Sequence, residues 1–136
     1  MGAVPKFDPN LVVFACSHSG APAARTAGEV PEVHLIEVPC SGKVDVIHLL
    51  KAFEDGADGV LVLGCFKEAC RYLEGNLRAA KRVGYVRSVL EEVGIEPERV
   101  QFQHLAPDMA QRFRELALQL AGKIRAMGPI PGKVKA

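Results

Sequence analysis

Short apolar runs alternate along the chain with longer segments in which apolar residues recur every three or four positions. Four runs have the length and composition of strands: LVVFAC (residues 11–16), VHLIEV (33–38), GVLVLGC (59–65) and RVQFQHL (99–105). Strands that alternate with helices join through right-handed crossovers into a parallel sheet. The pattern therefore predicts a single α/β domain with a four-stranded, mainly parallel sheet, flavodoxin-like or Rossmann-like in order, with helices on both faces.

The segment after the second run, VDVIHLLKAFEDG (residues 44–56), has a helical pattern. Its apolar residues recur every three positions, as Val44, Ile47, Leu50 and Phe53. This stripe predicts a helix that ends near Gly56 and turns these side chains toward the core.

Three further helices of unequal length are predicted. The longest runs from about Glu68 to Val93, and Gly75 and Gly84 inside it each cost about 1 kcal/mol relative to alanine, so we expect close packing at both glycines. The last helix starts after Pro107 and continues to Ile124. The small residues of HSGAPAARTAG (18–28) predict a first helix of only one or two turns. We expect an N-terminal extension (1–10), one domain (11–126) and a flexible Pro/Gly tail (127–136).

Composition narrows the possible partners. Of 136 residues, 49% are hydrophobic and 24% charged, with a formal net charge of +1. These values fit neither a disordered chain nor a nucleic-acid-binding domain. The beginning of the chain has no apolar core of signal-peptide length, and no apolar run approaches the roughly 20 residues that cross a bilayer. We expect a cytoplasmic protein, in which four cysteines are poor candidates for structural disulfides.

The four cysteines follow the predicted strands. Cys16 ends the first strand, Cys40 follows the second by two residues, Cys65 ends the third, and Cys70 opens the next helix. The carboxyl ends of parallel strands share one edge of a sheet, which is where open α/β folds bind ligands. Helix N-termini at this edge favour anions. Basic residues also lie close to the cysteines in sequence: Arg25, Lys43, Lys67 and Arg71.

Several types of site fit four converging thiols. They can hold a [2Fe–2S] or [4Fe–4S] cluster or a tetrahedral zinc ion, or they can be redox-active or inert thiols. His18 and His104, near the same edge, could replace a thiolate, whereas we expect His34 and His48 to be structural or solvent-facing. An oxyanion-binding loop after Cys16 is disfavoured, because such a loop needs an arginine after five intervening residues and the first arginine here is Arg25. A nicotinamide or flavin site is disfavoured because the first loop lacks the G-x-G-x-x-G dinucleotide fingerprint.

Three stretches together resemble one family: VPCSGKVDVIHLLKAFEDGADGVLVLGC (38–65), GCFKEACRYLEGN (64–76) and LEEVGIEPERVQF (90–102). They resemble the methyl-viologen-reducing hydrogenase delta subunit family over about residues 11–124. The shared features are a cysteine followed by Ser-Gly and a basic residue, a Gly-Cys pair at a strand end, and Cys-x-Tyr-x-x-Gly-Asn.

The resemblance implies an iron–sulfur electron-transfer subunit that carries a [2Fe–2S] cluster. Such a subunit joins a hydrogenase or another electron-donating oxidoreductase to a heterodisulfide-reductase-like complex. Cys16, Cys40, Cys65 and Cys70 occupy cysteine positions of the family, whereas Ser19 stands at or near a position where members commonly have a further cysteine. The alternative function is a structural zinc or thiol-redox module with the same fold.

Overall fold

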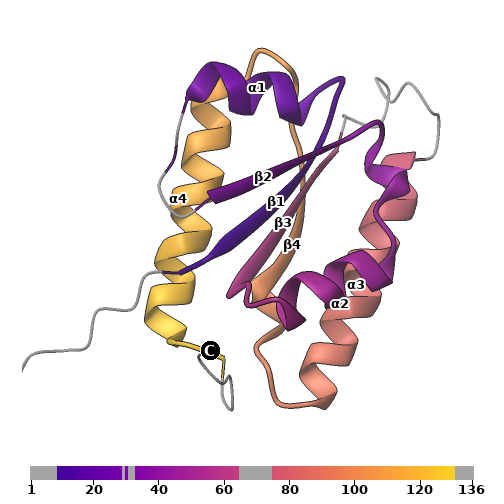
Figure 1. Cartoon of the computed structure of the whole chain (residues 1–136), viewed down its shortest axis with the longest axis vertical. Coiled ribbons are helices and arrows are strands. Elements are labelled where there is room, and N and C mark those ends of the chain that lie inside the picture. Colours follow the sequence, from indigo (N-terminus) through magenta and orange to yellow (C-terminus); the bar gives the residue numbers. More distant parts are fainter. Residues whose placement is uncertain (1–8, 29, 31–32, 65–74, 131–136) are drawn as a thin grey trace, which may run out of the picture.

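Four parallel strands form the centre of the chain in this computed structural model, which describes residues 9–28, 30, 33–64 and 75–130. The strands are β1 (Leu11–Cys16), β2 (Val33–Val38), β3 (Gly59–Gly64) and β4 (Val100–His104), in the spatial order β2-β1-β3-β4 (Figure 1). This is the beginning of the flavodoxin-like order and not the Rossmann order. The predicted four-stranded α/β sheet is confirmed, and every strand pair in it is parallel.

The strand register brings the carboxyl ends of the strands to one edge of the sheet. Cys16 at the end of β1 lies opposite Val38 at the end of β2. On the other side of β1, Ala15 lies opposite Leu63, and the next residue of β3, Gly64, lies opposite His104 of β4. This carboxyl edge therefore collects the residues that follow β1, β2 and β3.

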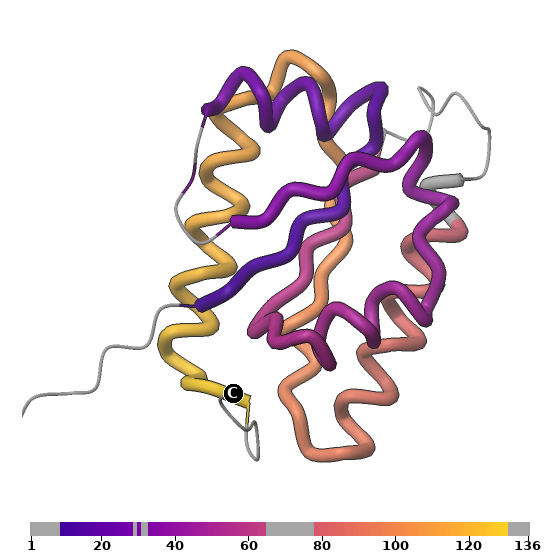
Figure 2. Tube along the Cα trace, viewed as in Figure 1, coloured from indigo at the N-terminus to yellow at the C-terminus, as the bar shows by residue number. Residues whose placement is uncertain are grey.

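Helices cover both faces of the sheet, as predicted (Figures 1 and 2). One face is covered by α1 (Gly20–Ala27) and α4 (Ala110–Met127), and the other by α2 (Val46–Glu54) and α3 (Gly75–Glu92). Two short 3-10 helices, η1 (Ser41–Lys43) and η3 (Pro97–Arg99), precede α2 and β4. The first helix has two turns, as expected, and the predicted start of the third, at residues 68–74, lies outside the described residues. None of the described helices is long and apolar enough to cross a membrane.

The sheet separates two apolar layers, which explains the unbroken apolar runs of its two inner strands. In β3, Leu61 and Leu63 pack toward α1 and α4, while Val60 and Val62 pack toward α2 and α3. A strand that is buried on both faces requires apolar residues at successive positions, not alternate ones. The edge strand β2 has the sequence VHLIEV, which includes His34 and Glu37, and four of its six residues are exposed.

Two expectations about helix packing were wrong. Ile47 was expected in the core, but 70% of it is exposed, and Leu49 is buried instead. Val44 lies before α2, so it does not share the helical phase of Ile47, and a strict three-residue repeat departs from the 3.6-residue period. Close packing does not explain Gly84, because a Cβ placed there would meet nothing within 4 Å.

A buried arginine ties together the opposite, amino edge of the sheet. Arg99 is fully buried and donates to Glu96 Oε1 at 2.8 Å, to Asp58 O at 3.1 Å and to Gly128 O at 2.5 Å. These acceptors belong to the turn before β4, the residue before β3 and the end of α4. One side chain therefore links two strand beginnings to the end of the last helix.

We predict that Arg99→Met lowers the free energy of unfolding by roughly 2–4 kcal/mol, because it leaves buried carbonyl acceptors without their donor. Urea denaturation followed by circular dichroism measures the loss. The control is Arg112→Met, which removes an exposed ion pair with Glu115 and should cost less than about 1 kcal/mol. Equal losses in the two variants would contradict the role assigned to Arg99.

The same contact predicts an acid-sensitive contribution to stability. The hydrogen bond from Arg99 holds the pKa of Glu96 below its ordinary value. A carboxylate with a lowered pKa stabilises the fold above its ordinary pKa, and this stabilisation disappears as pH falls through the lowered value. We expect Glu96→Gln to flatten the pH dependence of stability on the acid side of pH 4.5, the ordinary value, in urea titrations at several pH values. An unchanged slope would show that Glu96 makes no such contribution.

Candidate functional site

At the carboxyl edge, Cys16 lies next to the chain segment that leads into Cys40. Cys16 and Cys40 are both buried, with 1% and 3% of each residue exposed. The sulfur of Cys16 lies 3.9 Å from the carbonyl oxygen of Pro39, the residue directly before Cys40. Ser17 strengthens this junction, since its backbone N–H and its hydroxyl both donate to Val38 O, at 2.7 and 2.8 Å.

The short helix η1 holds Cys40 at its start. The amide N–H of Gly42 donates to the sulfur of Cys40 at 3.4 Å, and Lys43 N donates to Cys40 O at 2.9 Å. A hydrogen bond donated to sulfur favours the charged thiolate, which is the form that binds metals. The turn is therefore suited to present a thiolate ligand.

The end of β3 lies against the same turn. A Cβ placed on Gly64 would be 2.8 Å from the hydroxyl oxygen of Ser41 and 3.0 Å from the ring of Phe102. Only a glycine at this position lets the residue after Cys40 approach the residue before Cys65 so closely. The strand end that leads to Cys65 thus adjoins the turn that carries Cys40.

Cys65 and Cys70 themselves lie outside the described residues. Within the described part of the chain, no group of three or more His, Cys, Asp or Glu residues could hold a metal ion. The convergence of all four sulfurs therefore stays a prediction. The structure brings together Cys16, Cys40 and the end of β3.

Ser19 supplies a buried polar group one turn from Cys16. Its N–H donates to Cys16 O at 3.1 Å, and only 2% of the residue is exposed. Its hydroxyl oxygen has no hydrogen-bond partner in the described structure. A buried hydroxyl without a partner costs about 1–3 kcal/mol, so a group that accepts its hydrogen bond would be stabilised here. The hydroxyl fits a site for an anionic group with acceptor atoms.

The histidines have different surroundings. His48 accepts a hydrogen bond from Asp45 N at 2.9 Å through Nδ1 and so caps α2, which agrees with the structural role expected for it. The ring of His104 stands edge-to-face on Phe102, with the ring centroids 5.0 Å apart. His18 and His104 are both exposed, and a role for either as a ligand stays untested.

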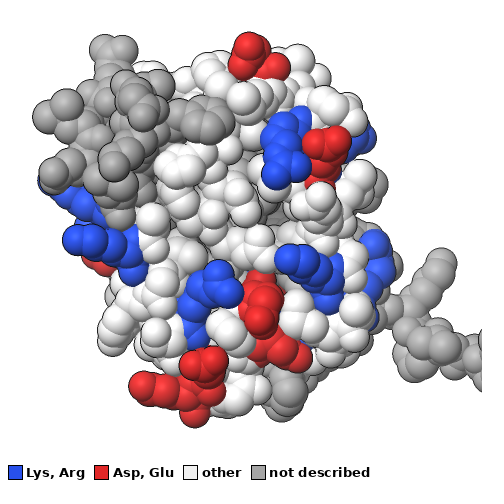
Figure 3. Space-filling model, turned by 180° about the vertical axis from the view of Figure 1, so that it is seen from behind, with Lys and Arg blue, Asp and Glu red and all other residues white. Residues whose placement is uncertain are grey.

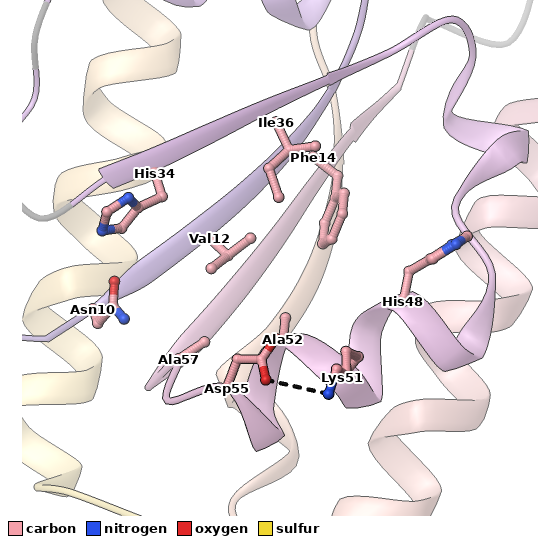
Figure 4. A pocket seen from close by; sticks show the side chains of 10 residues that line it. All are labelled: Asn10, Val12, Phe14, His34, Ile36, His48, Lys51, Ala52, Asp55 and Ala57. Carbon is pink, nitrogen blue, oxygen red and sulfur yellow. Dashed lines mark ion pairs between the residues drawn. The ribbon is translucent and has the colours of Figure 1, made fainter. Parts of the chain in front are cut away.

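A groove lies away from the cysteines, between the edge strand β2 and the helix α2 (Figure 4). Its volume is about 380 Å³, and Val12, Phe14 and Ile36 form its apolar floor. At its rim Lys51 pairs with Asp55 at 3.4 Å, and this carboxylate, together with Glu54, raises the pKa of Lys51. Neither of the described cysteines, Cys16 and Cys40, lines this groove.

The surface charge is mixed. The face drawn in Figure 3 intersperses basic and acidic side chains, with neither sign covering it. On this face, the described residues form no broad basic patch of the kind that binds nucleic acid.

Sequence reasoning missed two residues that shape the site, Ser41 and Arg82. The tight packing of Ser41 against Gly64 was indicated only by the glycine itself. Arg82 on α3 donates to Gly42 O in the Cys40 turn, 40 positions earlier in the chain. No local sequence pattern reveals a contact over that separation.

Comparison with known proteins gives consistent matches over nearly the whole chain. A family described as "Methyl-viologen-reducing hydrogenase, delta subunit" matches residues 11–128. An iron-sulfur subunit of an F420-non-reducing hydrogenase from Archaeoglobus profundus is 37% identical over 129 residues, which cover 91% of this chain and 94% of that protein. The vhu iron-sulfur subunit of an F420-non-reducing hydrogenase from Methanocaldococcus jannaschii is 34% identical over 133 residues, which cover 94% of this chain and 99% of that protein.

A longer protein contains a similar segment. One subunit of the ferredoxin:CoB-CoM heterodisulfide reductase from Methanosarcina mazei is 29% identical over 133 residues, which cover 93% of this chain but only 17% of that protein. The family match and the relatives of similar length agree with the resemblance found in the sequence. The chain belongs to the methyl-viologen-reducing hydrogenase delta subunit family.

Proposed function

We propose that this protein is an iron–sulfur electron-transfer subunit. It relays electrons between a hydrogenase or another donor oxidoreductase and a heterodisulfide-reductase-like complex. The observation that carries the proposal is the junction of the Cys16 strand end, the Cys40 turn and the end of β3 at one edge of the sheet. Relatives named as iron-sulfur subunits of hydrogenases support it.

The proposed centre is a [2Fe–2S] cluster held by Cys16, Cys40, Cys65 and Cys70. When bound, it would accept and release single electrons, and four thiolates complete its ligand set. The protein's own groups suit such an anionic centre. Gly42 N–H donates to the Cys40 sulfur, and the buried hydroxyl of Ser19 has a hydrogen bond to give. The family resemblance favours this cluster over the zinc or thiol-redox alternative.

The proposed partners follow from the names of the relatives. The relatives of similar length are named as hydrogenase subunits. In the Methanosarcina protein, a similar segment is part of a longer chain that is named as a subunit of a heterodisulfide reductase. We infer that this chain binds, as a separate subunit, to a heterodisulfide-reductase-like protein in the cytoplasm. Electron tunnelling falls off steeply with distance, so the carboxyl edge should face at least one redox partner.

We predict that Cys65→Ser removes most of the iron, because a neutral hydroxyl replaces a thiolate anchor. After anaerobic purification, iron, sulfide and visible absorption should fall together, whereas Ser19→Ala should have the milder effect. Wild-type protein should contain one iron per two ligating thiolates. Stoichiometric zinc without iron would support the alternative instead, and full iron content in Cys65→Ser would exclude that residue as a ligand.

A charge reversal tests the docking surface. Lys43 is exposed on η1, beside Cys40, so Lys43→Glu should slow electron transfer to a purified partner by about tenfold at low salt and less at high salt, where charges are screened. The cluster spectrum should not change. The control, Lys123→Glu, alters an exposed residue of α4 near the amino edge. Equal electron-transfer rates for Lys43→Glu and Lys123→Glu at every ionic strength would place docking elsewhere. We expect Lys67→Glu to slow electron transfer as Lys43→Glu does; Lys67 lies outside the described residues.

A further inference from the structure

Arg82 connects the helix α3 to the turn that carries Cys40. It lies on α3, half-buried, and its Nη1 donates to Gly42 O at 2.5 Å and to Val44 O at 3.0 Å. Gly42 lies inside η1, and Val44 caps its end. The last carbonyls of a helix lack partners within it, and a charged donor satisfies them more strongly than a neutral one.

The turn held in this way is the one that positions the Cys40 sulfur. Its second residue, Gly42, accepts from Arg82 through its carbonyl and donates to the Cys40 sulfur through its amide. The turn's own bonds are few, chiefly Lys43 N to Cys40 O and Val44 N to Ser41 O. A three-residue helix has little stability alone, so its geometry depends on contacts such as the one from Arg82.

The helix α3 also follows directly in the chain on residues 65–74, which include the other two proposed ligands. Arg82 therefore joins the Cys40 turn to the helix that follows Cys65 and Cys70 in the sequence. We propose that Arg82 is a positioning residue for the iron–sulfur centre. It fixes the Cys40 turn against α3 before a cluster is assembled, and it adds a positive charge beside an anionic centre. This inference rests on the proposed function.

A purely structural arginine would behave differently. If Arg82 only stabilised the fold, its loss would expose every buried cysteine to the reagent more often, and to a similar extent. If it holds the turn, Cys40 should respond and Cys16 should not, because the described hydrogen bonds at the end of β1 go to Val38 and Pro39, which precede the turn that Arg82 holds. Both cysteines are buried, so a thiol reagent reaches them through opening of the structure.

The first experiment uses the cluster-free full-length protein and iodoacetamide, with modification of each cysteine followed by mass spectrometry. In Arg82→Gln, Cys40 should react at least about tenfold faster, because both hydrogen bonds from the guanidinium to the turn are lost, and Cys16 should keep its wild-type rate. Arg82→Lys should restore most of the protection. The matched control is Arg87→Gln, an exposed arginine of the same helix, which should change neither rate.

The second experiment uses the anaerobically purified holoprotein. Arg82→Gln should release iron to an iron chelator several times faster than wild type, and its reduction potential should be more negative, because a nearby positive charge favours the reduced state. Arg82→Lys should keep the wild-type potential. Equal acceleration at Cys16 and Cys40, or unchanged rates at both, would overturn the positioning role.

The two experiments also separate this inference from the proposed function. Wild-type protein that lacks iron and sulfide would overturn the proposed function, and with it the assignment of Arg82 to a cluster. Selective exposure of Cys40 in the same variants would still show that Arg82 holds the turn. A normal cluster in Arg82→Gln, with unchanged potential and iron release, would overturn the inference and leave the proposed function intact.

Discussion

The parallel alignment of the strands is the constraint on which the rest of the structure depends. Parallel strands must each return through a crossover, so the helices cover both faces and the residues that follow the strands meet at one edge. In this protein the register brings the end of β1 level with the end of β2, and the end of β3 level with that of β4. Cysteines far apart in sequence therefore become candidates for one site.

The two edges of the sheet are stabilised in different ways. At the amino edge, the buried Arg99 satisfies a carboxylate and two backbone carbonyls. At the carboxyl edge, the side chains of Ser41 and Phe102 pack closely on Gly64, and a backbone N–H donates to the sulfur of Cys40. Buried side-chain hydrogen bonds therefore connect the amino edge, whereas a short turn and close packing form the carboxyl edge, where the candidate site lies.

An electron relay places modest demands on such a site. It needs no enclosed substrate cavity, but it needs ligands held in fixed positions near a surface that a partner can reach. Among the described residues, Cys16 and Cys40 lie at the carboxyl edge, and neither lines the groove beside α2. The contact of Arg82 with the Cys40 turn gives that edge a connection to α3. The position of Cys40, one of the proposed ligands, is thereby linked to the packing of α3.

The sequence by itself determined the strands and their alternation with helices. It also determined the placement of the cysteines after strands, because apolar runs, glycine stops and residue order are local properties. The tertiary structure decided the spatial order of the strands, which puts β2 at one edge with four of its six residues exposed and leaves β1 and β3 buried. It decided that Leu49 and not Ile47 enters the core, because the position of α2 after its N-cap Asp45 determines which of its residues face the sheet. It also decided the contacts of Arg82, Arg99 and Ser41, because each joins segments that only folding brings together.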